Sequence, residues 1–137
     1  ASMLDVRTVS GLLALAAAKL GVRRAMAYDN DPQCLIHARA NLRRNGVLAR
    51  VKLGVHDLLQ DPPPGTFDLV CANVYGRVLM DAAPTLARCT RRHLVLSGLR
   101  EHELDGVAEA YQALGGREIV RDGDGQWGGL VLDWSPV

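Results

Sequence analysis

Three polar side chains lie at the ends of apolar segments, where each could bind a ligand. Asp5 ends the first apolar run, Asp29 ends the second, and Asn73 ends the segment "FDLVCAN". A carboxylate at Asp29 can accept two hydrogen bonds from ribose hydroxyls, and an amide at Asn73 offers a donor and an acceptor together. Because ligands of open parallel sheets bind beyond the carboxyl ends of the strands, the pattern predicts that these segments meet at a nucleotide-like ligand.

Each of these residues alone has a plainer explanation. A lone aspartate after a strand is more often a loop cap, and a lone asparagine is most often a turn residue. The three together, at strand ends in chain order, favour a ligand site. The loop "DVRTVSG" after the first strand supports this interpretation, because its backbone N–H groups and the following helix N-terminus would face the ligand.

The elements that must position these residues alternate along the chain. Periodicity and turn signals predict strands at 3–6, 24–28, 51–54, 67–73, 93–99, 117–121 and 130–134, with helices between most of them and a turn at 61–65. Apolar strands separated by helices imply a mostly parallel sheet with helices on both faces. The last two strands have no helix between them, which predicts an antiparallel hairpin at the sheet edge.

The predicted helices carry more specific expectations. Residues 11–20 are apolar nearly all round, which predicts a well-buried helix capped by Ser10 and ended by Gly21. In the next helix Asp31 is the expected cap, Pro32 suits the first turn, and Gly46 ends it. Pro84 within residues 77–90 predicts the start of a second short helix, and residues 104–111 predict an amphipathic one.

Length, charge and cysteine usage narrow the class of protein. At 137 residues the chain is expected to form a single domain over residues 1–137, and a net charge of +1 favours neither nucleic acid nor membrane surfaces. No apolar stretch approaches the ~20 residues of a membrane span, and no export leader is visible. The three cysteines form no Cys-x-x-Cys pair, which predicts buried thiols in the reducing cytoplasm.

Several segments, in order, resemble the methyltransferase domain of the ribosomal protein L11 methyltransferase family. They are "LDVRTVSGLLALAAAKLG", "AYDNDPQCLIHARANLRRNGV", "FDLVCANVY", "DAAPTLAR", "LVLSGL" and "DGQWGGLVL", from residue 4 to residue 134. The resemblance implies a Rossmann-like class I methyltransferase fold, with a seven-stranded, mostly parallel sheet and an antiparallel edge strand. It also implies S-adenosylmethionine as cofactor and methyl transfer to lysine side chains or the N-terminal amine of a protein acceptor, ribosomal protein L11.

The resemblance also implies which residues form the site. It matches Asp5, Thr8, Ser10, Gly11, Asp29, Asn30, Asp57 and Asn73 to cofactor-binding positions, and Asn73 and Tyr75 to positions near the transferred methyl group. Asp29 corresponds to the acidic residue on the ribose, Asn30 to its neighbour beside the adenine, and Asp57 is expected to meet the adenine amine. Such chemistry needs no metal and no covalent nucleophile, because the protein only has to align a neutral amine and exclude water.

The chain departs from the family pattern in the cofactor loop. The family has Asp-x-Gly-x-Gly-x-Gly, whereas Arg7 and Val9 replace the first two glycines here and only Gly11 remains. Glycine permits positive φ and close approach of a ligand to the backbone, and a β-branched residue forced into that conformation is strained by about 1–3 kcal/mol. The alternative hypothesis is therefore a degenerate, non-catalytic module with weak or no cofactor binding.

Two further enzyme classes fit the residues less well. A nicotinamide-dependent dehydrogenase needs Gly-x-Gly-x-x-Gly at the first turn, which "VRTVSGLL" lacks. Adenine-directed nucleic-acid methyltransferases resemble one another in an Asn-Pro-Pro-Tyr or Asp-Pro-Pro-Tyr segment, but this chain has "ANVY" and no basic patch. The family also places a separate substrate-recruiting domain ahead of this one, and the first predicted strand here begins within a few residues of the start.

Overall fold

The computed structural model describes residues 1–62 and 65–136, in two compact units, Ala1–Pro63 and Pro64–Val137. The turn predicted at 61–65 lies partly outside the described residues. The described residues form seven strands, as predicted, and parallel pairs predominate among the strand pairs within the two units. Among the described helices, none has both the length and the apolar character that a bilayer crossing requires.

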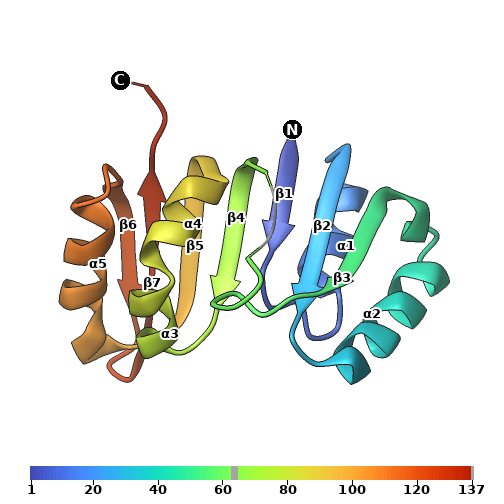
Figure 1. The fold of residues 1–137 in the computed structure, drawn as a ribbon, viewed down its shortest axis with the longest axis horizontal. Coiled ribbons are helices and arrows are strands. Elements are labelled where there is room, and N and C mark those ends of the chain that lie inside the picture. The colour runs from blue at the N-terminus through green and yellow to red at the C-terminus, as the bar shows by residue number, and fades with distance from the viewer. Residues whose placement is uncertain (63–64, 137) are drawn as a thin grey trace. The chain divides into compact units, whose positions relative to one another are not determined.

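The first unit consists of three parallel strands with two helices (Figure 1). Its elements are β1 (Ser2–Asp5), α1 (Leu12–Lys19), β2 (Arg24–Asp29), α2 (Pro32–Arg44), the 3-10 turn η1 (Leu48–Arg50) and β3 (Val51–Val55). The strand order is β3-β2-β1, and α1 packs on β1 and β2 while α2 packs on β2 and β3. The carboxyl ends of β1 and β2 therefore lie at the same edge of this part of the sheet.

Helix α1 differs from its prediction in two ways. Its N-cap is Gly11 in the left-handed conformation, with no side-chain cap, so the assignment of Ser10 as the cap was wrong. Only Ala14 and Ala18 are buried, whereas Leu12 and Leu20 are 64% and 86% exposed, so the prediction of a well-buried helix was also wrong. Short alanines let the helix lie close to the strands, and this narrow stripe makes the contact while the leucines face outward.

Helix α2 begins as its residues predict. The Asp31 carboxylate accepts the N–H of Gln33 at 2.9 Å, and Pro32 occupies the first turn. After the helix, Gly46 adopts a φ of 74°, in the left-handed region where glycine ends helices without strain. Buried Ala38 and Leu42 form the face that packs toward the sheet.

The second unit consists of four strands and three helices (Figure 1). Its elements are β4 (Phe67–Asn73), α3 (Gly76–Asp81), α4 (Ala83–Cys89), β5 (Thr90–Arg100), the 3-10 turn η2 (Glu101–Glu103), α5 (Leu104–Gln112), β6 (Arg117–Gly123) and β7 (Trp127–Asp133). The strand order is β4-β5-β7-β6, with β4 parallel to β5 and with β7 antiparallel to both β5 and β6. The predicted hairpin is present. Its strand β7 runs antiparallel to both neighbours and lies between β5 and the edge strand β6.

Local signals explain how the helices of this unit form. Pro84 lies in the first turn of α4, so two short helices replace one long one, as predicted. The apolar face of α5 is buried, and its Tyr111 hydroxyl donates a hydrogen bond to the Leu79 carbonyl at 2.7 Å. Burial raises the pKa of that phenol, which therefore stays a neutral donor. Of the three cysteines only Cys89 is buried, which corrects the expectation that all three thiols are.

Candidate functional site

The loop between β1 and α1 is held by its own backbone and by β2. The Thr8 N–H donates to the Tyr28 carbonyl at 2.8 Å, and the Gly11 N–H donates to the Thr8 carbonyl at 3.1 Å. Gly11 has a φ of 80°, and a Cβ there would lie 3.2 Å from the Cβ of Ala38 on α2. Glycine is thus needed at this position both for backbone conformation and for the close approach of the two helices.

Val9 adopts a left-handed backbone conformation, which glycine adopts without strain. Its φ is 54°, and it is the single non-glycine residue with positive φ in residues 1–62 and 65–136. A β-branched side chain is strained in this region, so the loop holds this conformation at a cost in conformational free energy. Arg7, at the other replaced glycine, is exposed and has no positive φ, so its backbone carries no such strain.

Asp29 joins this loop to the start of α2. One carboxylate oxygen accepts the Val9 N–H and the other accepts the Asp31 N–H, both at 3.0 Å. The side chain is only 2% exposed. Since each carboxylate oxygen has two lone pairs, Asp29 can accept one further hydrogen bond at each oxygen from a pair of hydroxyls.

Asp5, the last residue of β1, and Thr8 of the following loop are buried polar groups. Among the described residues, both carboxylate oxygens of Asp5 and the Thr8 hydroxyl have no hydrogen-bond partner of normal geometry. The pKa of Asp5 is raised to about 6: burial raises it most and the negative charge of Asp29 adds a smaller increase, while nearby Thr8 and the Arg7 backbone lower it. Unsatisfied buried polar groups cost free energy, and one reason for a chain to keep them is a ligand that satisfies them.

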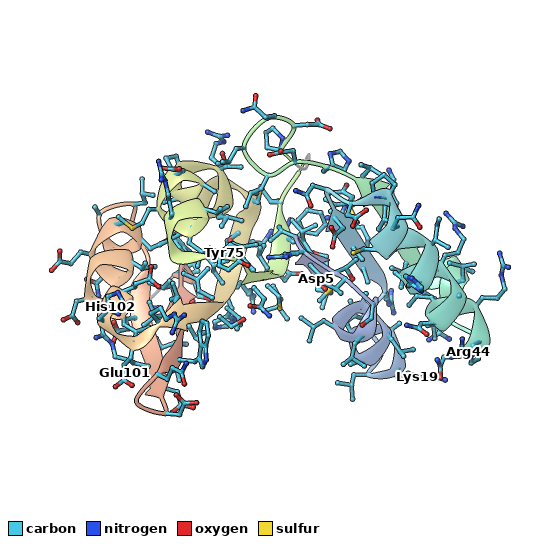
Figure 2. The ribbon with its side chains drawn as sticks, turned by 90° about the horizontal axis from the view of Figure 1, so that it is seen from below. Asp5, Lys19, Arg44, Tyr75, Glu101 and His102 are labelled. Atoms are coloured by element: carbon cyan, nitrogen blue, oxygen red, sulfur yellow. The ribbon has the colours of Figure 1, made fainter. Side chains whose placement is uncertain are left out.

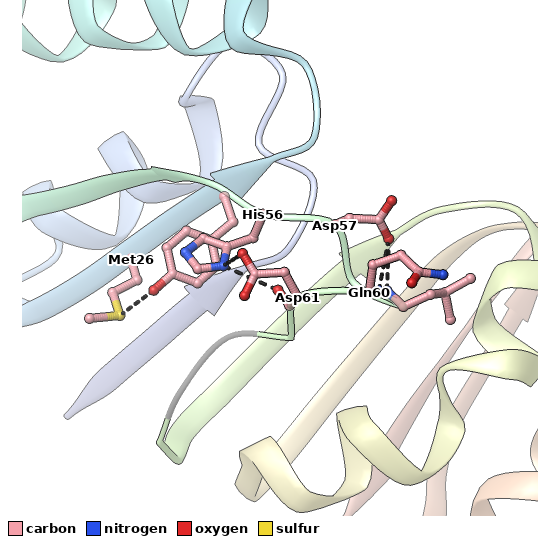
Figure 3. Close-up of polar contacts among 7 residues, drawn as sticks. Met26, His56, Asp57, Gln60 and Asp61 are labelled. Atoms are coloured by element: carbon pink, nitrogen blue, oxygen red, sulfur yellow. Dashed lines mark hydrogen bonds and ion pairs between the residues drawn. The ribbon is translucent and has the colours of Figure 1, made fainter.

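The remaining predicted residues of the first unit are more exposed. Asn30 is exposed beside Asp29, and the Ser10 carbonyl accepts a hydrogen bond from the Asn41 side chain at 2.9 Å. Asp57 follows β3 and accepts the N–H groups of Leu59 at 2.9 Å and Gln60 at 3.2 Å (Figure 3). One oxygen of Asp57 thus caps a turn, and its other oxygen is directed away from these bonds.

The segment before Asp57 is tied to β2 through His56. The backbone N–H of His56 donates to the Asp29 carbonyl at 3.0 Å. The centroid of the His56 ring lies 4.1 Å from that of the Tyr28 ring. The ring nitrogen Nδ1 lies 3.1 Å from the Asp61 carboxylate (Figure 3). These contacts position the turn that carries Asp57 beside the end of β2.

Asn73 lies at the end of β4 in the second unit. It pairs with Ser97 of β5, and its side-chain oxygen Oδ1 lies over Gly98, where any Cβ would collide with it. Gly98 has a φ of 80° and lies where the pairing of β5 with β7 shifts register. Glycine at this bulge therefore makes room for the Asn73 amide. The glycine in "LSGL" was the sequence signal for this bulge, and no prediction used it.

Tyr75 is the N-cap residue of α3 and is 68% exposed. The next residue, Gly76, lies against the Glu103 carboxylate so closely that a Cβ would collide with it. The same carboxylate accepts the Arg100 N–H at 2.7 Å. Glu103, which the sequence did not indicate, thus joins the loop after β5 to the segment that carries Asn73 and Tyr75.

A protein-family model for ribosomal protein L11 methyltransferase (PrmA) matches residues 1–133. The chain belongs to this family. Among curated L11 methyltransferases it is 39% identical to that of Myxococcus xanthus and 35% identical to that of Chloroflexus aurantiacus, over 93% and 94% of this chain. It covers 43% and 47% of those two proteins, so the chain spans less than half the length of these relatives.

Solved structures agree with this assignment. The ribosomal protein L11 methylase of Lactobacillus delbrueckii subsp. bulgaricus is 30% identical, with a TM-score of 0.87 over 96% of this chain and 68% of that one. Magnesium protoporphyrin IX methyltransferase from Synechocystis, solved with SAH bound, has a TM-score of 0.78 at 16% identity, which bears on the fold alone. The predicted class I methyltransferase fold is therefore confirmed for this L11 methyltransferase family member.

Proposed function

We propose that this chain is the catalytic part of an S-adenosylmethionine-dependent protein methyltransferase. The methyl acceptor would be an amine, a lysine side chain or the N-terminus, of a ribosomal protein L11-like protein. The observation that carries the proposal is the family match over residues 1–133, which includes the loop that holds Asp5, Thr8 and Gly11. We further propose that residues 1–137 act as one domain, in the cytoplasm, without direct contact with nucleic acid.

The residues of the first unit fit the cofactor. Asp29 has free lone pairs for the two ribose hydroxyls, and the unsatisfied Asp5 and Thr8 groups match a polar ligand at the loop. Asn30 and Asp57 would contact the adenine. Because Asp29 is buried, a ribose that reaches it must displace covering atoms, and the strained Val9 segment bonded to its Oδ2 is the nearest candidate to move.

Asn73 and Tyr75 would act on the methyl acceptor. The Asn73 amide can accept a hydrogen bond from an amine N–H, and Gly98 leaves room for the amide beside β5. A neutral amine held this way presents its lone pair, and the exposed Tyr75 ring would limit access of water. When bound, the sulfonium cofactor supplies an activated methyl group, so the chain's own residues need only orient the amine.

Calorimetric titration with S-adenosylmethionine tests this proposal. The chain is expected to bind it, Asp29→Asn is expected to weaken binding by about tenfold or more because a charged acceptor is lost, and Asp81→Asn serves as a control on α3. The double variant Arg7→Gly, Val9→Gly is expected to bind more tightly than the original chain.

The same titration judges the degenerate alternative, which none of the comparisons supports. Binding by both the original chain and the double variant supports the enzyme, and transfer of labelled methyl groups to purified ribosomal protein L11 then tests the acceptor. Binding by the double variant alone would overturn the proposal in favour of a module that has lost its cofactor. Absence of binding by both would overturn it as well.

A further inference from the structure

A cavity of about 390 Å³ opens between the end of β5 and the β6–β7 hairpin. We call it the hairpin pocket; its lining residues are Ser97, Gly98, Asp122, Gly123, Asp124, Trp127, Gly128 and Gly129. Ser97 pairs with Asn73, and the side-chain oxygen of Asn73 lies against Gly98. The hairpin pocket therefore adjoins the residue that we place beside the accepting amine.

One wall of the hairpin pocket already engages a cation. The Arg100 guanidinium carbon lies 4.3 Å from the centroid of the Trp127 ring, which is the geometry of a cation–π contact. Trp127 is 42% exposed, so the ring also presents surface to solvent. Arg100 thus covers one face of the indole, and the exposed part of the ring is what the hairpin pocket presents.

The rest of the rim is acidic. The Asp124 carboxylate accepts the N–H groups of Gln126 and Trp127 at 2.9 and 2.8 Å, and these bonds, with that from Trp127 the largest, lower its pKa. Asp122 is a second carboxylate of the lining, and the Glu101 side chain lies against Gly123, beside the hairpin (Figure 2). The neighbouring Arg121 is bound to Glu118 and Asp105 at 2.7 and 2.5 Å, so it is engaged outside this rim.

Four of the eight residues that line the hairpin pocket are glycines, which add no side chain to it. A Cβ on Gly128 would lie 2.8 Å from the Asp122 carbonyl oxygen, and one on Gly129 would lie 2.9 Å from that of Leu96. Packing alone thus excludes larger residues at these positions, and the consequence is a cavity with carboxylates at the rim and an aromatic wall. A long, positively charged side chain has the matching shape and charge.

We infer that the hairpin pocket anchors a basic side chain of the methyl acceptor, next to the amine that is methylated. The inference rests on the proposed function for the identity of the acceptor. The bound side chain is an anchor and not the reacting amine, because carboxylates favour the protonated form of an amine, which has no lone pair for attack. Trp127, Asp122 and Asp124 are then residues that determine acceptor specificity.

Titration of the isotope-labelled chain with short acetylated peptides, followed by nuclear magnetic resonance, tests this inference. The peptides carry a central lysine, arginine or ε-acetyl-lysine, and no S-adenosylmethionine is added. The lysine and arginine peptides are expected to shift the indole N–H of Trp127 but not that of Trp134. Binding should weaken at high salt, because ionic screening reduces the attraction, and ε-acetyl-lysine should not bind.

Matched variants localise the effect. Trp127→Leu and Asp124→Asn are each expected to weaken peptide binding by about fivefold, whereas Trp127→Phe retains a ring and Asp81→Asn lies on α3, so both should bind like the original chain. Equal binding of the ε-acetyl-lysine peptide, or binding unaffected by Trp127→Leu, would overturn the inference. Loss of cofactor binding in the calorimetric experiment would instead overturn the proposed function and leave this titration unaffected.

Discussion

Single side chains in the loop after β1 combine conformational strain with unsatisfied polarity. Val9 holds a left-handed backbone conformation, Asp29 receives the Val9 N–H, and Asp5 and Thr8 lie buried without partners of normal geometry among the described residues. Natural proteins concentrate such costs at functional positions, because packing alone would favour removing them. Two substitutions measure these costs separately.

Asp5 should make stability depend on pH. Its pKa is raised from 3.8 to about 6, so the folded chain takes up this proton at a higher pH than the unfolded chain does. The ionised carboxylate thus destabilises the fold above about pH 6, and this penalty is lost as the pH falls toward about 4. Asp5→Asn is expected to raise the free energy of unfolding by on the order of 2–3 kcal/mol at neutral pH and by much less near the unfolded-state pKa.

Urea unfolding at neutral and at acidic pH measures this effect, with Asp81→Asn as the control. An equal gain at both pH values would contradict the assignment, since a neutral carboxyl carries no buried charge for the substitution to remove.

Val9→Gly should stabilise the chain. Relief of a left-handed conformation is worth roughly 1–2 kcal/mol or more for a β-branched residue, and the entropy that glycine adds to the unfolded chain costs about 0.5–1 kcal/mol. The free energy of unfolding is therefore expected to rise by about 1 kcal/mol. In urea unfolding, Val9→Ala keeps a Cβ but removes the branch, so its stability should lie between those of the original chain and Val9→Gly. A Val9→Gly chain less stable than the original would show that the packing of Val9 outweighs its strain.

Among the helices and strands, glycines decide how closely neighbouring elements approach. Gly11 places α1 against α2, Gly76 places α3 against the Glu103 carboxylate, and Gly98 lets Asn73 lie over β5. In each case the glycine comes from one element and the neighbour from another. These contacts keep the candidate residues of each unit in place, so they should be sensitive to a single added methyl group.

Gly11→Ala and Gly21→Ala form a matched pair that separates crowding from backbone strain. Both glycines have positive φ, 80° and 93°, but a Cβ on Gly11 would lie 3.2 Å from Ala38 whereas one on Gly21 would meet nothing within 4 Å. Gly21→Ala is expected to cost about 1 kcal/mol of stability for the backbone alone, and Gly11→Ala about 2–3 kcal/mol. Equal losses in urea unfolding would show that α1 and α2 can move apart freely.

The whole chain has the fold of its family, and the sequence indicated that fold through several weak motifs that occur in the family's order. Strand count, parallel pairing and the final hairpin were all predicted, and the family model matches nearly the full length. The apolar helix α1 was predicted to be buried, yet its first residue Leu12 and its C-cap Leu20 are among the most exposed apolar residues. Composition shows that a helix is apolar but does not show how much of its surface a neighbour covers.

The sequence by itself determined those features that depend on neighbours along the chain. The Asp31 cap, the break at Pro84 and the turn at Gly46 follow from steric limits and hydrogen bonds within a few residues, and the alternation of strands and helices follows from side-chain periodicity. Only the tertiary structure decided the bond between Val9 and Asp29, twenty residues apart, and the place of Glu103 beside Gly76. Such contacts join segments that are distant in sequence, and their geometry is set by how the strands and helices pack, which no local pattern of residues records.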